Sequence, residues 1–342
     1  MIFDHPEFDH HERVCHVSDP KSGLLAIVVV HRSRGRVAAG GVRFRPYASE
    51  AGALTDVLRL SRAMTYKNVL ADLPLGGAKS VILGDPKRDK TPERMRAFGR
   101  VVESFGGAYM CGPDIGTTAD DMDVISEETA HVGATNRQMG SSGPPTALGV
   151  FQGVRALAHH LFGSPDLTGV RVAIQGAGAV GSDLARHLVE AGARVTIADV
   201  SEDAVRAVRE STPVDVAPPD RILSVDADVL APCALGGILS ERTIPDLRVR
   251  GICGGANNQL ATEDDARRLR ERGIALVPDF VASAGGVIAG TAAAGLYPQE
   301  EMRAKLDGIY DRSLAILRTA DAEELTPHEV AYRMAREILE RE

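Results

Sequence analysis

The sequence lacks paired cysteines, long apolar runs and an excess of basic residues. The four cysteines form no CxxC pair and stand far apart, at Cys15, Cys111, Cys233 and Cys253. This spacing argues against a disulfide framework or a zinc site and predicts reduced thiols in a cytoplasmic protein. No apolar run reaches the roughly 20 residues that a membrane helix needs, so we expect no membrane span. The net charge of −8 argues against nucleic acid or an anionic membrane as the main partner, because both favour basic surfaces.

The N-terminus, MIFDHPEFDHHERVCH, is polar and acidic. It has neither the basic start nor the apolar core of a signal peptide, which again favours a cytoplasmic location. His5, His10 and His11 could bind a metal ion. A flexible polar end is the commoner meaning of such a cluster, so we predict no metal site.

The chain of 342 residues is long enough for two domains, and 44% hydrophobic with 25% charged residues is typical of a soluble globular protein. It contains no repeat and no low-complexity tract. The stretch GSSGPP at residues 140–145 is typical of a hinge. We therefore expect one domain over residues 1–142 and a second over residues 143–321.

Two lysines, Lys67 and Lys79, stand in the mostly apolar and glycine-rich stretch MTYKNVLADLPLGGAKSVILGDP. Lysine is costly to bury without a partner, so their presence needs an explanation. Residues 24–31 read as a strand, and Ser49 reads as the N-cap of a helix. Apolar residues recur along one face of that helix, at Ala53, Val57, Leu60 and Met64. Lys67 continues the same stripe and faces inward, unless its stem reaches past the helix end into water.

Lys79 precedes a predicted buried strand at residues 80–83 and lies at its edge, with Pro74 and Gly76–Gly77 as the turn before it. The two glycines allow the backbone to approach something small. This combination suggests a bound ligand, although an ordinary ion pair of Lys79 would also fit.

The second half carries a dinucleotide-binding pattern. A strand at residues 170–175 leads into GAGAVG, which places Gly176, Gly178 and Gly181 at GxGxxG spacing before a predicted helix. Such a helix N-terminus attracts the pyrophosphate. A second strand ends at Asp199, which could accept hydrogen bonds from ribose hydroxyls and repel a 2′-phosphate. A capping role for Asp199 is the alternative.

Three further strands are predicted at residues 227–232, 249–253 and 274–278. Small or polar residues follow each of them and should line the cofactor crevice, because ligands bind beyond the carboxyl ends of such strands. Thr326, Pro327 and Glu329 predict the start of a last helix, over about residues 322–342, which we expect to pack on the first domain.

In chain order the sequence carries the motifs AAGGVRF, MTYKN, LPLGGAKSVI, GPDIGTTADDMD, TALGVFQG, GAGAVG, APCALGG, GGANNQL and VPDFVASAGGV. This set resembles the glutamate/leucine/phenylalanine/valine dehydrogenase family, and most closely its leucine/phenylalanine/valine branch. The likeness runs from about residue 13 to the last helix. It implies an α/β protein with an N-terminal substrate and oligomerisation domain, a Rossmann-type doubly wound domain, and a cleft between them.

The resemblance also implies a reaction, the reversible oxidative deamination of an L-amino acid to a 2-oxo acid and ammonia with NAD or NADP. Lys67 matches the lysine that holds the substrate α-carboxylate, and Lys79 matches the catalytic lysine. Asp114 matches the aspartate that handles the amino-group proton. Burial favours an uncharged lysine that can act as a base, whereas a nearby carboxylate opposes this. Asp199 favours NAD as the cofactor.

The remaining assignments also come from the resemblance. The substrate site would include Gly40, Gly41, Met64, Ala39, Gly112, Asn258, Val287 and Gly290. The cofactor site would include Gly176, Gly178, Ala179, Val180, Gly181, Asp199, Thr146, Cys233, Ala234, Asn257 and Asn258.

The side-chain pocket is expected to be apolar. Glutamate-type members place a lysine at the position of Ala39 and a hydroxyl at that of Gly290, and this chain has neither. Small residues at both positions favour bulky aliphatic or aromatic substrates, unless side chains such as Met64 or Met110 fill the space.

Two features depart from the family pattern, Ala78 in GGAK and Ser283 in place of an asparagine. They put catalytic efficiency in question more than reaction class. A glutamate-type enzyme and a non-catalytic nucleotide-binding protein remain alternatives. The resemblance further implies a homo-oligomer, at least a dimer.

Overall fold

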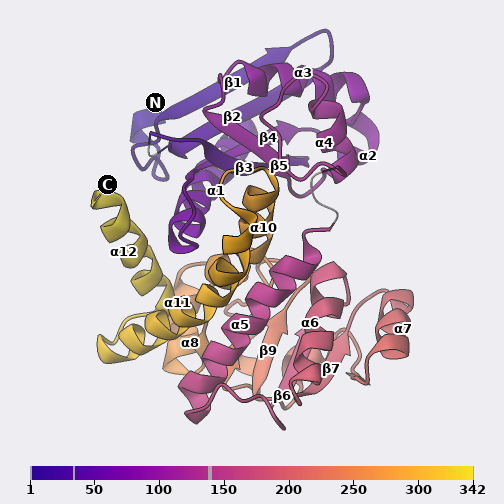
Figure 1. Cartoon of the computed structure of the whole chain (residues 1–342), viewed down its shortest axis with the longest axis vertical. Coiled ribbons are helices and arrows are strands. Elements are labelled where there is room, and N and C mark those ends of the chain that lie inside the picture. The colour runs from indigo at the N-terminus through magenta and orange to yellow at the C-terminus, as the bar shows by residue number, and fades with distance from the viewer. Residues whose placement is uncertain (1, 34, 138–140, 342) are drawn as a thin grey trace. The chain divides into compact units, whose positions relative to one another are not determined.

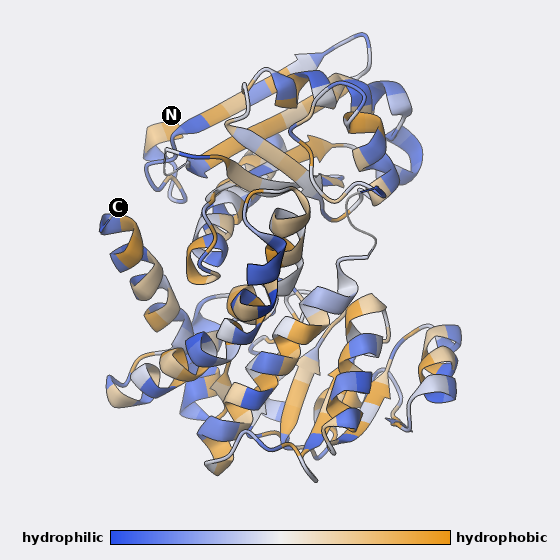
Figure 2. Ribbon diagram, viewed as in Figure 1, coloured by the Kyte–Doolittle hydropathy of each residue, from blue (hydrophilic) through white to orange (hydrophobic). Residues whose placement is uncertain are grey.

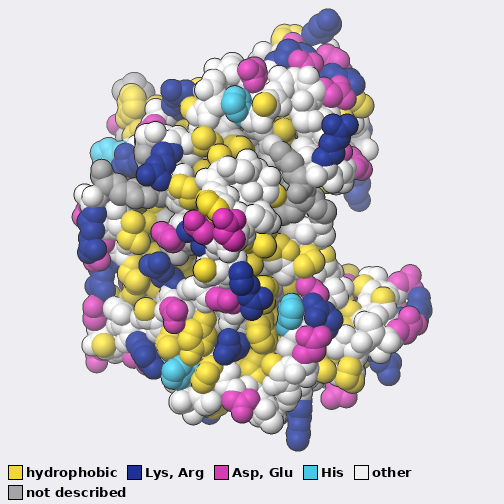
Figure 3. Space-filling model, viewed as in Figure 1, with side chains coloured by type: hydrophobic (Ala, Val, Ile, Leu, Met, Phe, Trp, Pro, Cys, Tyr) yellow, Lys and Arg dark blue, Asp and Glu magenta, His cyan; other side chains and the backbone are white. Residues whose placement is uncertain are grey.

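The structure is a computed structural model that describes residues 2–33, 35–137 and 141–341, and it divides into two compact units (Figure 1). The first unit comprises residues 1–140, 290–299 and 336–342, and the second comprises residues 141–289 and 300–335. All four cysteines are described, and all are free thiols. No helix in the described part of the chain is both long and apolar enough to cross a membrane. On the face seen in Figure 3, basic and acidic side chains are interspersed.

The first unit is built on a five-stranded mixed sheet with the strand order β1-β2-β4-β3-β5. β1 and β2 pair antiparallel, as do β2 and β4, whereas β3 runs parallel to both β4 and β5. Its elements are η1 (Ile2–Asp4), β1 (Arg13–Asp19), β2 (Leu24–Arg32), β3 (Ala38–Arg45), α1 (Glu50–Leu70), β4 (Gly76–Leu83), α2 (Pro86–Asp89), α3 (Pro92–Glu103), β5 (Tyr109–Pro113) and α4 (Ala119–Ile125).

Helices cover both faces of this sheet, so its inner strands are buried on both sides (Figure 1). On one face α1 packs against Ile27, Val29 and Val81. On the other face α3 and α4 contribute Phe98 and Met122 to a larger apolar cluster. α1 begins as predicted, because the Ser49 side chain accepts a hydrogen bond from the backbone N–H of Gly52.

The prediction for β4 was wrong in its start. The strand begins at Gly76, so the glycine pair lies inside the strand and Lys79 stands in its middle. Because Gly77 has no side chain, it allows α1 to approach β4 closely. A Cβ atom there would lie 2.0 Å from the backbone nitrogen of Thr65 in α1. Gly77 is therefore required by close helix–strand packing, and Gly76 by the Arg32 carbonyl oxygen of β2, 1.8 Å from where a Cβ atom would lie; the pair forms no turn.

The second unit contains a six-stranded sheet with the order β11-β10-β9-β6-β7-β8, in which every pairing is parallel. This is the Rossmann-type order, with the strand order reversing between β6 and β9. β9 and much of α5 consist of apolar residues, and α5 packs beside α6 (Figures 1 and 2). The elements from residue 143 to the end of the chain are α5 (Gly143–Phe162), β6 (Arg171–Gln175), α6 (Ala179–Glu190), β7 (Arg194–Ala198), α7 (Glu202–Ser211), β8 (Asp215–Val216), η2 (Ile222–Ser224), β9 (Val229–Pro232), η3 (Ile244–Asp246), β10 (Gly251–Ile252), α8 (Asp264–Glu271), β11 (Ala275–Leu276), α9 (Asp279–Ala282), α10 (Gly285–Ala293), η4 (Gln299–Glu301), α11 (Met302–Ala322) and α12 (Pro327–Glu340). Residues 290–299 and 336–342 among these belong to the first unit.

The predicted strands of this unit are all present, although β10 and β11 are only two residues long. The predicted start of the last helix is confirmed. Thr326 and Glu329 form reciprocal hydrogen bonds, Glu329 Oε2 accepting from Thr326 N and Thr326 Oγ1 accepting from Glu329 N.

Candidate active site

Lys79 and Asp114 meet at the face of the first sheet that is covered by α1. Side chains alternate along a strand, so Lys79 in β4 points to the same face as Val81, which packs on α1. Gly41 pairs with Gly112 of the neighbouring β5, and Asp114 follows at the end of that strand. The sheet thus brings together two residues that are 35 positions apart in the sequence.

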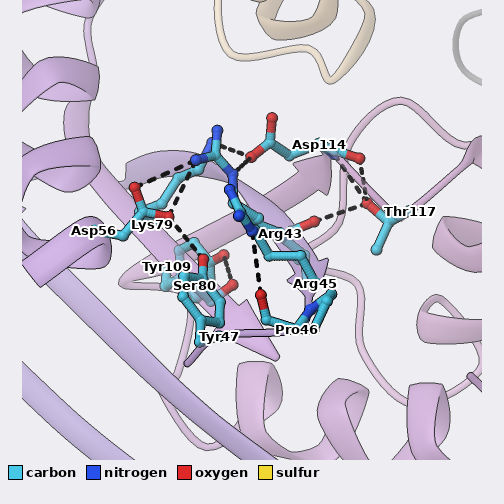
Figure 4. Close-up of polar contacts among 11 residues, drawn as sticks. Arg43, Arg45, Pro46, Tyr47, Asp56, Lys79, Ser80, Tyr109, Asp114 and Thr117 are labelled. Carbon is cyan, nitrogen blue, oxygen red and sulfur yellow. Dashed lines mark hydrogen bonds and ion pairs between the residues drawn. The ribbon is translucent and has the colours of Figure 1, made fainter. Parts of the chain in front are cut away.

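The Asp114 carboxylate is shared by two cations. Its Oδ2 atom lies 2.9 Å from Nζ of Lys79 and accepts a hydrogen bond of 2.9 Å from Nε of Arg43 (Figure 4). The side chains are 7% exposed for Lys79, 13% for Asp114 and 6% for Arg43. The arrangement is a largely buried ion-pair cluster, in which low solvent access strengthens each interaction.

Asp114 is held in its ionised form. Burial alone would raise the pKa of its carboxyl, but the charges and hydrogen bonds of Lys79 and Arg43 outweigh burial and hold the pKa well below the usual range. The Asp114 side chain is therefore an ionised hydrogen-bond acceptor at neutral pH.

The glycine pair in β3 serves two purposes. A Cβ atom at Gly40 would lie 1.6 Å from the Ala78 carbonyl oxygen, so this glycine permits close strand packing. A Cβ atom at Gly41 would lie 2.8 Å from Cβ of Asp114 and 3.3 Å from Nζ of Lys79. The absence of a side chain at Gly41 therefore leaves backbone next to the two charged groups.

Lys67 and Met64 lie near the C-terminal end of α1, and both are partly buried. The same part of α1 is anchored on β4, because Asn68 Nδ2 donates a 2.6 Å hydrogen bond to the Gly76 carbonyl oxygen. The helix that carries Lys67 and the strand that carries Lys79 are thus in direct contact.

Two of the predicted pocket residues lie on the same sheet. Ala39 is buried, pairs with Gly77 and Met110 on either side, and alternates onto the face of Gly41 and Lys79. Gly112 is partly buried in β5. The other two predicted pocket residues, Val287 and Gly290, lie three positions apart on α10 and are partly buried.

The predicted glycine loop joins β6 to α6 in the second unit. Gly176 has a φ of +105°, which strongly favours glycine, and a Cβ atom there would lie 3.0 Å from Cβ of Ala234 and from the Cys233 carbonyl oxygen. A Cβ atom at Gly181 would lie 1.9 Å from the Gly176 carbonyl oxygen. Gly178 is the N-cap of α6, so no cap side chain covers the first N–H groups of the helix. Ala179 and Val180 supply two of these N–H groups, and the geometry fits a pyrophosphate.

Asp199 follows β7 and contacts the glycine loop. Its Oδ2 accepts a 2.7 Å hydrogen bond from Ala177 N, and its Oδ1 accepts a 2.8 Å hydrogen bond from Ser201 N. The capping role considered as an alternative is therefore present. Each carboxylate oxygen can accept more than one hydrogen bond, so this role leaves capacity for ribose hydroxyls.

The other predicted cofactor residues lie on the loops after β9 and β10, except Thr146, which lies in α5. Gly236 approaches Asn257 so closely that a Cβ atom there would lie 2.6 Å from the Asn257 carbonyl oxygen. Asn258 has a φ of +53°, and its N–H donates a 2.8 Å hydrogen bond to Oδ2 of the buried Asp279. Thr146 in the first turn of α5 lies against Gly286, where a Cβ atom would come within 2.7 Å of Thr146 Oγ1.

The structure adds residues that the sequence prediction missed. Arg43 is the main one, and Asp56 of α1 accepts hydrogen bonds from both Arg43 and Tyr47. The signal was available for Arg43. It stands two positions after Gly41, so strand alternation predicts that it shares the face of the ligand-approach glycine.

The interpretation of the N-terminal histidines as a flexible polar end was wrong for His11. It is buried, its Nε2 lies 3.0 Å from the Leu58 carbonyl oxygen, and its ring lies 4.7 Å from that of His31. Among the described residues no group of three or more His, Cys, Asp or Glu side chains could hold a metal ion.

The second unit defines this chain as a dinucleotide-binding protein by its sheet order, its glycine loop and the Asp199 contact. The sequence model of the Glu/Leu/Phe/Val dehydrogenase dimerisation domain matches residues 11–131. The model of the glutamate/leucine/phenylalanine/valine dehydrogenase domain matches residues 141–205 and 195–338.

Proteins named as amino-acid dehydrogenases match nearly the whole chain. Leucine dehydrogenase of Thermoactinomyces intermedius is 42% identical over 99% of this chain and 93% of its own length. Valine dehydrogenase of Streptomyces coelicolor is 43% identical over 97% and 93%, respectively. The crystal structure of L-tryptophan dehydrogenase from Nostoc punctiforme superposes with a TM-score of 0.85, at 38% identity and with coverage of 97% of this chain and 96% of that one. The chain belongs to the glutamate/leucine/phenylalanine/valine dehydrogenase family, in its leucine/phenylalanine/valine branch, and is an amino-acid dehydrogenase by family.

Proposed function

We propose that the protein catalyses the reversible, NAD-dependent oxidative deamination of an apolar L-amino acid, bulky aliphatic or aromatic, to the 2-oxo acid and ammonia. The observation that carries the proposal is the pairing of a buried lysine, Lys79, with an ionised Asp114 beside the bare backbone of Gly41. A buried lysine–aspartate pair is costly to maintain, and a protein that only binds nucleotides would have no use for it in this domain.

Under this proposal the substrate amino acid is bound by its charged ends. Lys67 on α1 pairs with the α-carboxylate, and Asp114 accepts a hydrogen bond and a proton from the amino group. Lys79, as an uncharged amine, takes a proton from the water that adds to the iminium carbon of the substrate. Gly40 and Gly41 let the backbone approach the substrate. Release of ammonia then gives the 2-oxo acid.

The cofactor would be held by the glycine loop, the α6 N-terminus and Asp199, with contributions from Thr146, Cys233, Ala234, Asn257 and Asn258. When bound, NAD supplies the acceptor for the hydride that leaves the substrate Cα. The chain fits this group because the Gly178 cap leaves the helix N-terminus open and the ionisable Asp199 stands at the end of β7.

The two departures from the family pattern are compatible with this activity. Ala78 belongs to the apolar cluster on the side of the sheet opposite Lys79, so its methyl group does not enter the reactive face. Ser283 is buried at the end of α9, where its N–H donates to the Asp279 carbonyl oxygen. We expect Ser283 to affect rate rather than reaction type.

Residues 1–142, with the last helix, would form the substrate and oligomerisation domain, and residues 143–321 the NAD domain. We further propose that the protein forms at least a dimer through the first of these. Sedimentation at micromolar concentration tests this, and a species of only 36.3 kDa would rule the dimer out.

The function is tested by incubating the purified protein with each of the twenty L-amino acids and NAD and by following NADH absorbance. We expect the highest kcat/KM for a bulky aliphatic or aromatic substrate. Failure to reduce NAD with any amino acid would refute the activity, and glutamate as the best substrate would refute the apolar pocket.

A further inference from the structure

We propose that Arg43 is a positioning residue that serves as the permanent counter-ion of Asp114 and holds its carboxylate aimed at the substrate throughout turnover. The inference rests on the proposed dehydrogenase function. It concerns a group for which the sequence and the family comparison assigned no role.

The first observation is that the two oxygens of the Asp114 carboxylate have different partners. Lys79 and Arg43 both bind Oδ2, each at 2.9 Å. The Oδ1 atom has no hydrogen-bond partner among the described residues, and in Figure 4 it points away from both cations. One oxygen is therefore fixed by the protein and the other remains available to a ligand.

The second observation is that Arg43 is itself held from two sides. Its Nε donates to Asp114, while its Nη1 donates to Oδ2 of Asp56 at 3.1 Å. The Tyr47 hydroxyl donates a 2.7 Å hydrogen bond to the same Asp56 oxygen. The planar guanidinium cannot rotate without breaking one of these bonds, so Arg43 transmits a fixed position to Asp114.

The third step follows from the chemistry of the two cations. Lys79 must give up its positive charge in order to act as a base, and the carboxylate of Asp114 then loses one partner. Arginine stays charged at every accessible pH. Arg43 therefore keeps a positive charge on Asp114 while Lys79 changes its protonation state.

The charged and titratable groups around this pair come from every element packed against it. Lys79 of β4 faces Asp114, Asp56 of α1 and Tyr47 face Arg43, and Tyr109 of β5 lies on the opposite face of the sheet, with its hydroxyl bonded to Ser80 and the Gly40 carbonyl. With Lys79 protonated, two cations balance two carboxylates. Removal of Arg43 leaves an excess negative charge, which favours protonation of both Asp114 and Lys79.

Arg43→Gln should therefore move the acidic limb of the kcat/KM–pH profile to higher pH by about one unit, since this limb reports the group that acts as the base, and loss of a neighbouring positive charge favours its protonated form. At neutral pH we expect kcat/KM to fall roughly 10- to 100-fold, the scale of a misplaced catalytic group. Arg43→Lys, which keeps the charge, should restore the limb largely to its original position. Tyr47→Phe should shift it in the same direction as Arg43→Gln, but less.

Arg45→Gln is the matched control. Arg45 lies on the same strand two positions further on, but it is exposed, donates to the Pro46 carbonyl oxygen and makes no contact with Asp114 (Figure 4). Its removal takes away the same charge nearby and should leave the pH profile in place. NADH binding and the thermal unfolding midpoint verify that each variant is folded.

A double-mutant cycle decides whether Arg43 acts through Asp114. In an Asp114→Asn background, Arg43→Gln should lower kcat/KM by less than about 2-fold, because residues that act as a unit are not additive. An unshifted pH limb, or the full loss in the Asp114→Asn background, would overturn the proposal. An inactive wild type would refute the proposed function instead. The same cycle measured by unfolding midpoints would then support the counter-ion role if the two substitutions are coupled, and would overturn it if they are additive.

Discussion

Nζ of Lys79 lies 2.9 Å from Oδ2 of Asp114, and both groups stand on a sheet face from which solvent is largely excluded. The pair joins the middle of β4 to the end of β5. Because Asp114 also binds Arg43, it remains paired when Lys79 is replaced, and the first domain should keep its fold in such variants.

Lys79→Ala should therefore lower kcat by about 10²- to 10⁴-fold, the usual cost of losing a general base. NADH binding, measured by fluorescence titration, should remain, because the residues proposed to hold the dinucleotide all lie in the second unit. Lys90→Ala is the matched control, since Lys90 also forms a partly buried ion pair in the first unit, with Asp121 at 2.7 Å. Turnover of Lys79→Ala at the rate of Lys90→Ala would show that Lys79 has no catalytic role.

Lys67→Ala should act mainly on substrate binding. Loss of the partner for the α-carboxylate is expected to raise KM for the amino acid by roughly 10- to 100-fold, the equivalent of one charge-assisted hydrogen bond. Arg59→Ala, on the same helix but with a side chain that is half exposed, should leave KM unchanged. Steady-state kinetics with the best substrate distinguishes the two, and an unchanged KM in Lys67→Ala would remove Lys67 from the site.

Asp199 should set the preference for NAD over NADP. Asp199→Asn is the informative variant, because the amide oxygen can still accept a hydrogen bond from Ala177 while the charge is lost. The NAD-to-NADP ratio of kcat/KM should fall at least about tenfold, since like charges roughly 4 Å apart near a protein surface repel by several kcal/mol. Asp203→Asn, at an exposed position on α7, serves as the control. A ratio equal to that of the wild type would exclude Asp199 from cofactor selection.

Ala39→Leu should narrow the side-chain pocket. Ala39 lies on the reactive face of β3, between Gly77 and Met110, so added atoms there would project toward the bound side chain. We expect kcat/KM to fall more for phenylalanine than for valine, by roughly tenfold or more, as is usual when a larger group is forced into a filled space. Equal losses for both substrates would place Ala39 outside the pocket.

His11 should make stability depend on pH. Burial, reinforced by the charge of His31, lowers the pKa of His11 from 6.5 to about 4, against the opposing effects of the Leu58 carbonyl and Asp9. A depressed pKa favours the neutral form in the folded state, so this contribution to stability is full above pH 6.5 and is lost as pH falls toward 4.

Denaturant unfolding at several pH values tests this. Between pH 6.5 and 4 the slope of the unfolding free energy should be smaller in His11→Gln than in the wild type, by up to about one bound proton. His16→Gln, on the exposed side of β1, should keep the wild-type slope. Identical slopes in all three proteins would mean that His11 is protonated in the folded state as readily as in the unfolded chain.

The sequence was informative where one residue type has one physical meaning. The glycine loop, Asp199 and the caps at Ser49 and Thr326 all follow from local geometry, and each was found at its predicted place. The prediction of a turn at Gly76–Gly77 was wrong, because the sequence alone does not distinguish a glycine required in a turn from one required by close packing in a strand. Only contacts with distant parts of the chain distinguish them, namely Arg32 of β2 against Gly76 and Thr65 of α1 against Gly77.

The charge network around Asp114 could be predicted only in part. Lys79 and Asp114 were recognised by motif, whereas Arg43 was recognisable only from its two-residue spacing after Gly41. Its bond to Asp56 is a tertiary contact between β3 and α1 that no local pattern encodes. The burial of His11 could not be predicted for the same reason, since nothing in the polar N-terminal sequence indicates that His11 will contact the Leu58 carbonyl of α1.

The contact between α1 and β4 at Gly77 has a consequence for how the enzyme could change its substrate. The backbone nitrogen and the hydroxyl group of Thr65 lie directly against Gly77, so any side chain at position 77 would force the helix away from the strand. Under the proposed roles, Lys67 and Lys79 act on the groups that all amino acids have in common, and the close contact between α1 and β4 fixes their relative positions. The residues proposed to contact the variable side chain of the substrate, such as Ala39, take no part in this α1–β4 contact. Single substitutions in the pocket wall can therefore change substrate selectivity without disturbing the α1–β4 contact. Mutant libraries meant to alter substrate scope should leave Gly76 and Gly77 unchanged.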